Sequence, residues 1–122
     1  MDFEFSFDNT RMIFYKYYSG NLSYNDFESS WLYIINNQLF PGGTKGILID
    51  YRKALVQFPI DEAYRISTFF NCNLHIFNNQ KIAFVTSTPE QIILPELVRE
   101  YASNYQSRPF STIEAAEDWL AG

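Results

Sequence analysis

The sequence has little of what several common functions require. Its single cysteine, Cys72, cannot form an internal disulfide. No uncharged apolar stretch approaches the roughly 18 residues that cross a bilayer, and the first residues lack the basic and apolar regions of a signal peptide. Nine Lys and Arg against fourteen Asp and Glu give a net charge of −5, which opposes binding to DNA or anionic lipid. We therefore expect a cytoplasmic protein without nucleic-acid binding or membrane insertion.

Aromatic residues, in contrast, are abundant. Twelve Phe, nine Tyr and two Trp make up 19% of 122 residues, a length that fits a single domain over residues 1–122. Such a content is compatible with a stacking platform, a ligand cavity or an oligomer interface. We expect most of these rings to lie in an ordinary core, because the remaining composition is that of a globular chain.

The first part of the chain predicts a β-hairpin and then a helix. Residues 2–8 alternate between polar and aromatic side chains, as in a strand with one apolar face. Residues 11–18 are apolar on both faces, which predicts a deeper strand that ends at residues 19–21. Helical spacing of apolar residues begins after Ser23, which forms a weak capping box with Asp26.

Strands and helices alternate in the rest of the chain. Residues 46–51 predict a central buried strand, followed by a loop through Phe58 and a helix over about 60–70 with Ala63, Ile66 and Phe70 inward. Residues 81–86 predict the next strand.

A further helix is expected after Thr88, where Gln91 completes a capping box. At Pro95 this helix either kinks or has its true start, and the sequence leaves both open. Residues 109–110 predict a short edge strand, and Ser111 with Glu114 is expected to cap the last helix.

The resulting order is β-β-α-β-α-β-α-β-α. Strand and helix alternation after an opening hairpin predicts an α/β fold with a mostly parallel sheet, in which the hairpin supplies an antiparallel edge.

Polar residues follow two of the expected parallel strands. Asp50 and Arg52 leave the first, and Ser87 and Thr88 leave the second. Because ligands of open α/β sheets bind beyond the carboxyl ends of the strands, these four residues are a candidate site for an anion or another small ligand. Each also has an ordinary structural interpretation: a carboxylate that accepts loop amides, a surface ion pair and a helix N-cap.

Evidence for catalysis or for a metal site is weak. Cys72 and His75 are three residues apart, but no third group orients them, and two ligands are too few for zinc. A partly buried cysteine and a surface histidine are the simpler interpretation. We expect neither enzymatic activity nor a cofactor.

Three segments together resemble a known family: GILIDYR at residues 46–52, KIAFV at 81–85 and PFSTIEAAEDWL at 109–120. The chain resembles, from about Phe3 to its end, the SpoIIAA-like group of bacterial proteins, which are related to the STAS domains of anti-sigma-factor antagonists and of sulfate-transporter tails. The resemblance implies a SpoIIAA-like α/β fold.

In antagonist-type STAS domains a serine at the start of the helix after the central strand is phosphorylated, and the added charge blocks docking to a kinase-like partner. Residues 51–61 of this chain contain no Ser or Thr. The resemblance therefore does not extend to this switch or to the sigma-regulatory role that depends on it.

Two functional hypotheses follow. The first is a non-enzymatic interaction module that binds another protein or its own copy through aromatic residues of the hairpin, namely Phe3, Phe5, Phe7, Tyr15 and Tyr17. The alternative is a small-ligand domain that binds an anion, nucleotide or lipid at Asp50, Arg52, Ser87 and Thr88.

Overall fold

The computed structural model describes residues 1–57, 59, 62, 64–89, 91–92 and 105–122. Its elements are β1 (Asp2–Asp8), β2 (Ile13–Leu22), α1 (Tyr24–Asn36), β3 (Gly46–Val56), α2 (Tyr64–Asn71), α3 (Leu74–Phe77), β4 (Lys81–Val85), β5 (Gln106–Phe110) and α5 (Ile113–Ala121). The strands form one sheet in the order β1-β2-β3-β4-β5, antiparallel between β1 and β2 and parallel elsewhere. The expected α/β fold with an antiparallel edge hairpin is confirmed.

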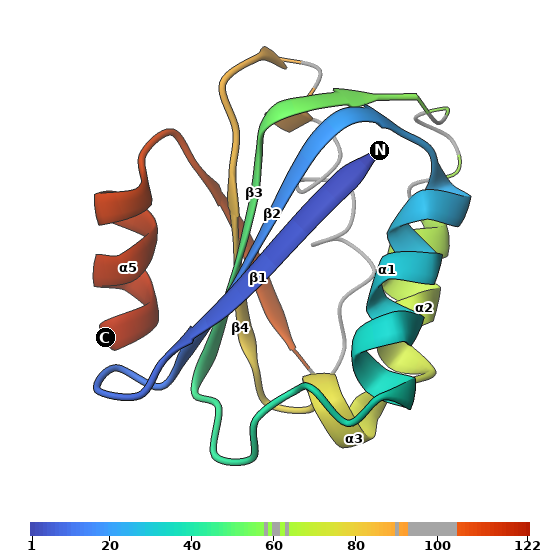
Figure 1. Cartoon of the computed structure of the whole chain (residues 1–122). Coiled ribbons are helices and arrows are strands. Elements are labelled where there is room, and N and C mark those ends of the chain that lie inside the picture. The colour runs from blue at the N-terminus through green and yellow to red at the C-terminus, as the bar shows by residue number, and fades with distance from the viewer. Residues whose placement is uncertain (58, 60–61, 63, 90, 93–104) are drawn as a thin grey trace.

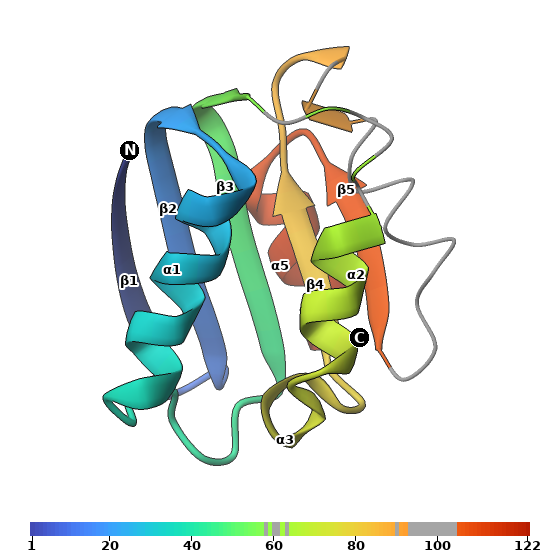
Figure 2. The same cartoon turned by 90° about the vertical axis from the view of Figure 1, so that its right-hand side faces the viewer.

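Helices cover both faces of the sheet (Figures 1 and 2). Helices α1, α2 and α3 lie on one face and α5 on the other. Among the described helices, none combines the length and apolarity that crossing a bilayer requires.

The core has two parts, one on each face of the sheet. The larger one lies under α1 and α2 and is rich in rings, including the fully buried Phe27, Trp31 and Phe70. The smaller one lies under α5 and includes Leu48, Val85, Ala116 and Leu120. Many of the aromatic residues therefore lie in an ordinary core, as the composition predicts.

The predicted hairpin forms, and Asp8 holds its turn. The register pairs Phe3 with Tyr18 and Phe7 with Phe14, and the Asp8 carboxylate accepts hydrogen bonds from the backbone N–H groups of Thr10 at 2.8 Å and Arg11 at 3.0 Å. Such side-chain bonds to nearby amides are what makes aspartate a turn residue.

Strands β2 and β3 are both longer than the sequence predicts. Residues 19–21 do not end β2, and residues 52–56 are strand rather than loop, because the two segments pair with each other from Ser19 and Lys53 onward. The register shifts between Tyr17 and Ser19, and Gly20 has φ +79°. A bulge and a glycine let the strand bend without ending.

The helix predictions are confirmed in part. Ser23 and Asp26 form the reciprocal capping box, and Ile66 and Phe70 are buried. Ala63 and the alternatives at Pro95 lie outside the described residues.

The N-cap of the last helix lies one residue later than the sequence predicts. Thr112, not Ser111, is the N-cap of α5, and its hydroxyl accepts a hydrogen bond from the Ala115 N–H at 3.1 Å. Ser111 is the cap that the sequence predicts because Glu114 stands three positions after it, which is the spacing of a capping box.

The two residues therefore differ in their expected contribution to stability. Thr112→Ala should lower the free energy of unfolding by about 1 kcal/mol, because it leaves a helix N–H without its acceptor. Ser111→Ala is the matched control and should change it by less than about 0.5 kcal/mol. Urea denaturation followed by circular dichroism measures both. Equal effects of the two substitutions would contradict the assigned cap.

Candidate binding site

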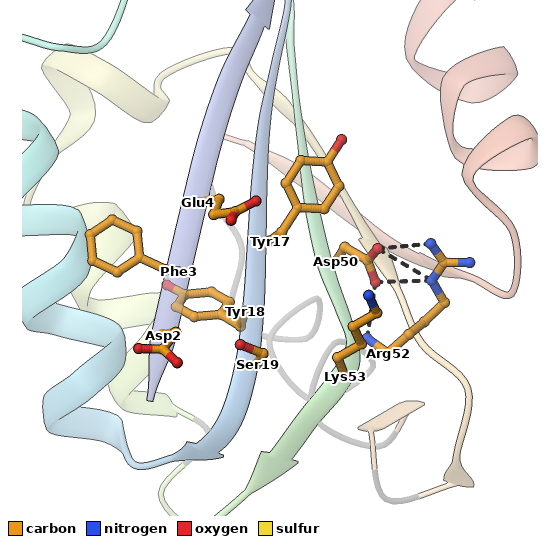
Figure 3. A pocket seen from close by; sticks show the side chains of 9 residues that line it. All are labelled: Asp2, Phe3, Glu4, Tyr17, Tyr18, Ser19, Asp50, Arg52 and Lys53. Carbon is orange, nitrogen blue, oxygen red and sulfur yellow. Dashed lines mark hydrogen bonds and ion pairs between the residues drawn. The ribbon is translucent and has the colours of Figure 1, made fainter.

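A polar hollow of about 660 Å³ lies where β1 begins and where β2 and β3 approach their ends (Figure 3). Its lining comes from three adjacent strands: Asp2, Phe3, Glu4, Tyr17, Tyr18, Ser19, Asp50, Arg52 and Lys53. The volume falls within the usual range for a small-ligand cavity. Two of the four ligand residues proposed from sequence, Asp50 and Arg52, are part of this lining.

Asp50 and Arg52 are bound to each other. The Arg52 Nη2 and Nε atoms donate to the two Asp50 oxygens at 2.9 and 3.0 Å, and the Arg52 backbone N–H donates to Oδ1 at 2.9 Å. Asp50 is buried while Arg52 remains largely accessible. The carboxylate thereby fixes the guanidinium and offsets most of its charge. The structural interpretations of Asp50 as an acceptor of a nearby amide and of Arg52 as part of an ion pair are therefore confirmed, and both residues also line the hollow.

Other groups in the polar hollow carry an excess of negative charge. Asp2 and Glu4 lie on the same face of β1, because successive side chains of a strand point to opposite faces. Tyr17 projects between Glu4 and Asp50 (Figure 3). Burial, and then the charge of Asp50, raises the pKa of Tyr17, so its hydroxyl stays protonated and can donate a hydrogen bond. Apart from Arg52, which is paired with Asp50, the positively charged residue in this lining is Lys53.

Ser87 and Thr88 are not part of this hollow. Their backbone N–H groups donate to the Gln91 Oε1 atom at 2.7 and 3.3 Å, and Thr88 Oγ1 accepts from the Gln91 N–H at 3.3 Å. These bonds form the capping box expected at Thr88. The four proposed ligand residues are therefore split into a pair inside the hollow and a pair that builds a turn beyond β4.

Gln91 also connects this turn to β3. Its Nε2 atom donates to the backbone carbonyl groups of Tyr51 at 2.8 Å and Ala54 at 2.9 Å, and the side chain is buried. The sequence identified Gln91 as a capping residue but gave no sign of its two partners about forty positions earlier.

The five aromatic residues proposed as an interaction surface do not share one face. Phe3 and Phe7 are half-buried against the core under α1, and Phe5 is 37% exposed on the same side of β1. Tyr15 and Tyr17 belong to the opposite face, under α5. Alternation along two paired strands puts the two sets on opposite sides of the sheet.

Tyr15 is also unavailable for binding. It is buried, and its hydroxyl donates to the Glu117 carboxylate of α5 at 2.5 Å. Glu117 accepts a second contact from Arg11 at 3.2 Å, and Arg11 is also bound to Asp8 at 3.1 Å. This network joins the hairpin turn to α5, so Tyr15 has a structural role.

An apolar hollow of about 430 Å³ lies on the α1 side of β1. It is lined by Met1, Phe3, Phe5, Ser29, Ser30 and Tyr33. Met1, Phe5 and Tyr33 are among the more exposed large apolar residues of the described chain. Phe3 lines both hollows, which therefore flank the beginning of β1.

Beneath the apolar hollow lies a buried lysine that the sequence interpretation overlooked. Lys16 has no exposed surface, and its Nζ atom donates to the Ser30 Oγ atom at 2.6 Å. It lies over the rings of Trp31 at 4.1 Å and Tyr18 at 4.7 Å from their centroids. Alternation was the available signal, because Lys16 stands between Phe14 and Tyr18 on the inward face of β2.

Burial lowers the pKa of Lys16 well below its usual value. Across residues that the structure describes, no carboxylate forms an ion pair with it. Desolvation thus disfavours the charged form of the amine, while the hydrogen bond to Ser30 and the faces of the surrounding rings act in favour of that form.

Cys72 and His75 do not form a reactive pair with a third group. Both side chains are exposed, so Cys72 is less buried than the sequence suggested. Cys72 lies in the turn between α2 and α3. No cluster of three metal-ligating side chains occurs within the described ranges.

Comparison with solved structures identifies the architecture. The chain superposes on an uncharacterized protein of the DUF3478 family from Shewanella loihica PV-4, described as having a SpoIIAA-like fold, with a TM-score of 0.65. The match covers 97% of this chain and 93% of that one at 14% sequence identity. The fold is SpoIIAA-like. No family model and no curated protein matches the sequence, so the structural likeness defines the fold and leaves the function to be inferred from the site.

Proposed function

We propose that this SpoIIAA-like domain is a non-enzymatic binding module that takes up an extended segment of a partner protein along β1. The observation that carries the proposal is the composition of this edge strand. One face presents the acids Asp2 and Glu4, and the other presents Phe3 and Phe5 beside the apolar hollow. An added strand that alternates basic and apolar side chains complements both faces.

Strand β1 has the position that strand addition requires. It pairs with β2 on one side and is the terminal strand of the sheet that the structure describes. An edge strand leaves a row of backbone N–H and C=O groups that another strand can bind. The backbone supplies affinity in such complexes, and the alternating side chains supply specificity.

A partner of opposite charge fits this edge better than a second copy does. Antiparallel pairing of two β1 strands centred on Phe5 would place Asp2 opposite Asp8. Like charges directly opposite each other destabilise paired strands. A basic segment instead places cations beside Asp2, Glu4 and the polar hollow, while its apolar side chains contact Phe5 and Tyr33.

The test uses two synthetic peptides of the length of β1, one alternating lysine with valine and one alternating glutamate with valine. We expect the lysine peptide to shift the amide resonances of β1 in heteronuclear NMR spectra and the glutamate peptide to leave them unchanged. Reversal of both acids, in Asp2→Lys with Glu4→Lys, should weaken the lysine peptide at least about tenfold at low salt.

Asp118→Lys, an exposed charge reversal on α5, is the matched control and should retain binding. The proposal fails if the lysine peptide does not bind, if its shifts lie away from β1, or if the doubly reversed variant binds it equally well. Dimerisation of the unmodified protein through β1 would favour the second copy as the occupant.

The volume of the polar hollow supports a second candidate, the binding of a small anion, nucleotide or lipid headgroup at Arg52 and Lys53. The Asp50 pair and the nearby acids weaken it, since they offset the positive charge. Native mass spectrometry of protein recovered from its own cells tests this candidate. A bound small molecule that is lost in Arg52→Ala would support it, and ligand-free protein would contradict it.

A further inference from the structure

The apolar hollow lies beside the strand edge at which we propose that a partner segment binds. Its lining comes from the beginning of the chain and from α1, namely Met1, Phe3 and Phe5 on one side and Ser29, Ser30 and Tyr33 on the other. The Phe3 and Tyr33 rings form an edge-to-face pair with 6.1 Å between their centroids, and the Phe5 ring lies 6.4 Å from that of Phe3. The hollow is therefore a recess between a strand and a helix whose walls are largely aromatic.

Strand addition directs one side chain of the partner to this recess. A strand that pairs with β1 lies about 4.8 Å away, and each of its residues points to the same face as the β1 residue opposite it. Phe3 points to the α1 face and stands between Met1 and Phe5 in the lining. The partner residue opposite Phe3 is therefore directed to the hollow. This step rests on the proposed function, because strand pairing fixes the direction of the side chain.

The rings of the hollow favour an aromatic side chain over an aliphatic one at this position. The hollow measures about 430 Å³, and Tyr33 is 53% exposed, so an incoming ring meets uncovered aromatic surface. Aromatic pairs with centroids about 4.5 to 7 Å apart gain more than their buried area alone provides. The hydroxyl group of Ser29, which is exposed on α1, offers an acceptor for the N–H of a tryptophan or the O–H of a tyrosine.

We propose that the partner segment carries an aromatic residue opposite Phe3, and that the apolar hollow is the pocket for this anchor. The segment has a basic residue on either side of the anchor, because Asp2 and Glu4 flank Phe3 in β1. The recognised sequence is therefore basic, aromatic, basic. Protein interfaces concentrate their affinity in aromatic residues seated in pockets, so the anchor sets the affinity while backbone pairing sets the orientation.

A second copy of this chain supplies such an anchor poorly. In an antiparallel pair of β1 strands centred on Phe5, Phe7 of one copy stands opposite Phe3 of the other. Phe7 is half-buried against the core of its own copy, and its neighbour Asp8 would stand opposite Asp2. We therefore expect the anchor to come from a different polypeptide.

The experiment compares three seven-residue peptides that alternate lysine and valine, with lysine at both ends. The parent has valine at its centre, and the other two have tryptophan or leucine there. We expect the tryptophan peptide to bind at least about tenfold more tightly than the parent, and the leucine peptide less than about threefold more tightly. Titration followed by NMR gives each Kd. Nuclear Overhauser contacts from the indole protons to the rings of Phe3 and Tyr33 should identify the pocket.

Ser29→Trp tests the hollow itself, because it fills the recess with a ring of the chain's own. In this variant we expect the tryptophan peptide to bind no more than about twofold more tightly than the parent. Asn36→Trp is the matched control, since it places the same side chain at an exposed position of α1 outside the lining, and it should retain the full gain. Asp2→Lys with Glu4→Lys alters the opposite face of β1 and should weaken both peptides by a similar factor, which leaves the ratio of their Kd values unchanged.

The outcomes separate this inference from strand addition. If the parent peptide shifts the β1 amides but tryptophan gives no gain, or leucine gives an equal one, the anchor pocket is refuted and strand addition stands. Retention of the full gain in Ser29→Trp, or indole contacts elsewhere on the protein, refutes the pocket in the same way. If no peptide shifts the β1 resonances, strand addition fails and the anchor pocket fails with it.

Discussion

Lys16→Met should raise the free energy of unfolding at pH 7 by about 2 kcal/mol. Methionine fills a volume similar to that of the lysine stem and has no polar group that must lose its hydration. The Ser30 hydroxyl keeps its bonds to Tyr18 and to the Phe27 carbonyl. The variant therefore removes a buried amine without leaving a new unpaired partner.

The size of this gain should depend on pH. Because the folded-state pKa of Lys16 is lowered, the unfolded chain binds one more proton than the folded chain at pH values between that pKa and about 10.4. Stability of the unmodified protein therefore rises with pH in this window, by about tenfold in the folding equilibrium per pH unit. Lys16→Met lacks this group, so its advantage shrinks as the pH rises.

Parallel urea titrations of the two proteins at pH 7, 8 and 9 measure the effect. Groups common to both proteins cancel in the difference, which leaves the contribution of Lys16. A difference that stays constant over this range would contradict a lowered pKa of Lys16 in the folded protein. The titratable Tyr18 ring lies 4.7 Å from the amine, but burial raises the pKa of Tyr18 well above the usual value, so it does not titrate in this range.

Gln91→Leu should lower the free energy of unfolding by about 3 kcal/mol. The substitution removes the hydrogen-bond donor to the carbonyl groups of Tyr51 and Ala54 and the acceptor for the N–H groups of Ser87 and Thr88. Each buried polar group that loses its partner costs about 1 to 3 kcal/mol, and water replaces part of the loss at the exposed turn.

Gln91→Glu refines this prediction. The carboxylate keeps an acceptor for the turn amides but directs a second oxygen at two carbonyl groups, so we expect a loss at least as large as that in Gln91→Leu at pH 7. Gln57→Ala, at an exposed position after β3, should change stability by less than about 0.5 kcal/mol. Chemical denaturation compares all three, and a Gln91→Glu protein as stable as the unmodified one would contradict the assigned donor role.

Local patterns were sufficient to predict the five strands in order and the helices α1, α2 and α5, whereas α3 was not predicted and the helix expected after Thr88 lies mostly outside the described residues. Alternation of polar and aromatic residues marked β1, and the capping box at Ser23 marked the start of α1. The ends of β2 and β3 were missed because their last residues are held by pairing with each other. A strand that continues through Ser19 and Gly20 has no apolar alternation of its own to show it.

The site was harder to predict for the same reason. The sequence predicted that Asp50 accepts nearby amides and that Arg52 forms an ion pair, and both hold, but it did not predict that the two residues pair with each other. Ser87 and Thr88 follow the parallel strand β4 at the same end of the sheet, but a local capping box occupies their polar groups. The burial of Lys16 was not predicted because this residue stands within an apolar run, where a single charged residue is usually interpreted as an outward-facing position of a strand.

The antiparallel direction of β1 brings its first residue to the end of the sheet where the parallel strands finish. Met1 lines the apolar hollow, and its Cα atom is 3.8 Å from the position that a Cβ atom on Gly20 would occupy. The C-terminus lies apart from this region, beside α5 (Figure 1). We therefore expect a polypeptide joined ahead of Met1, such as an affinity tag or a fusion partner, to emerge beside the two hollows and to obstruct them. A segment joined after Gly122 should leave both hollows unobstructed.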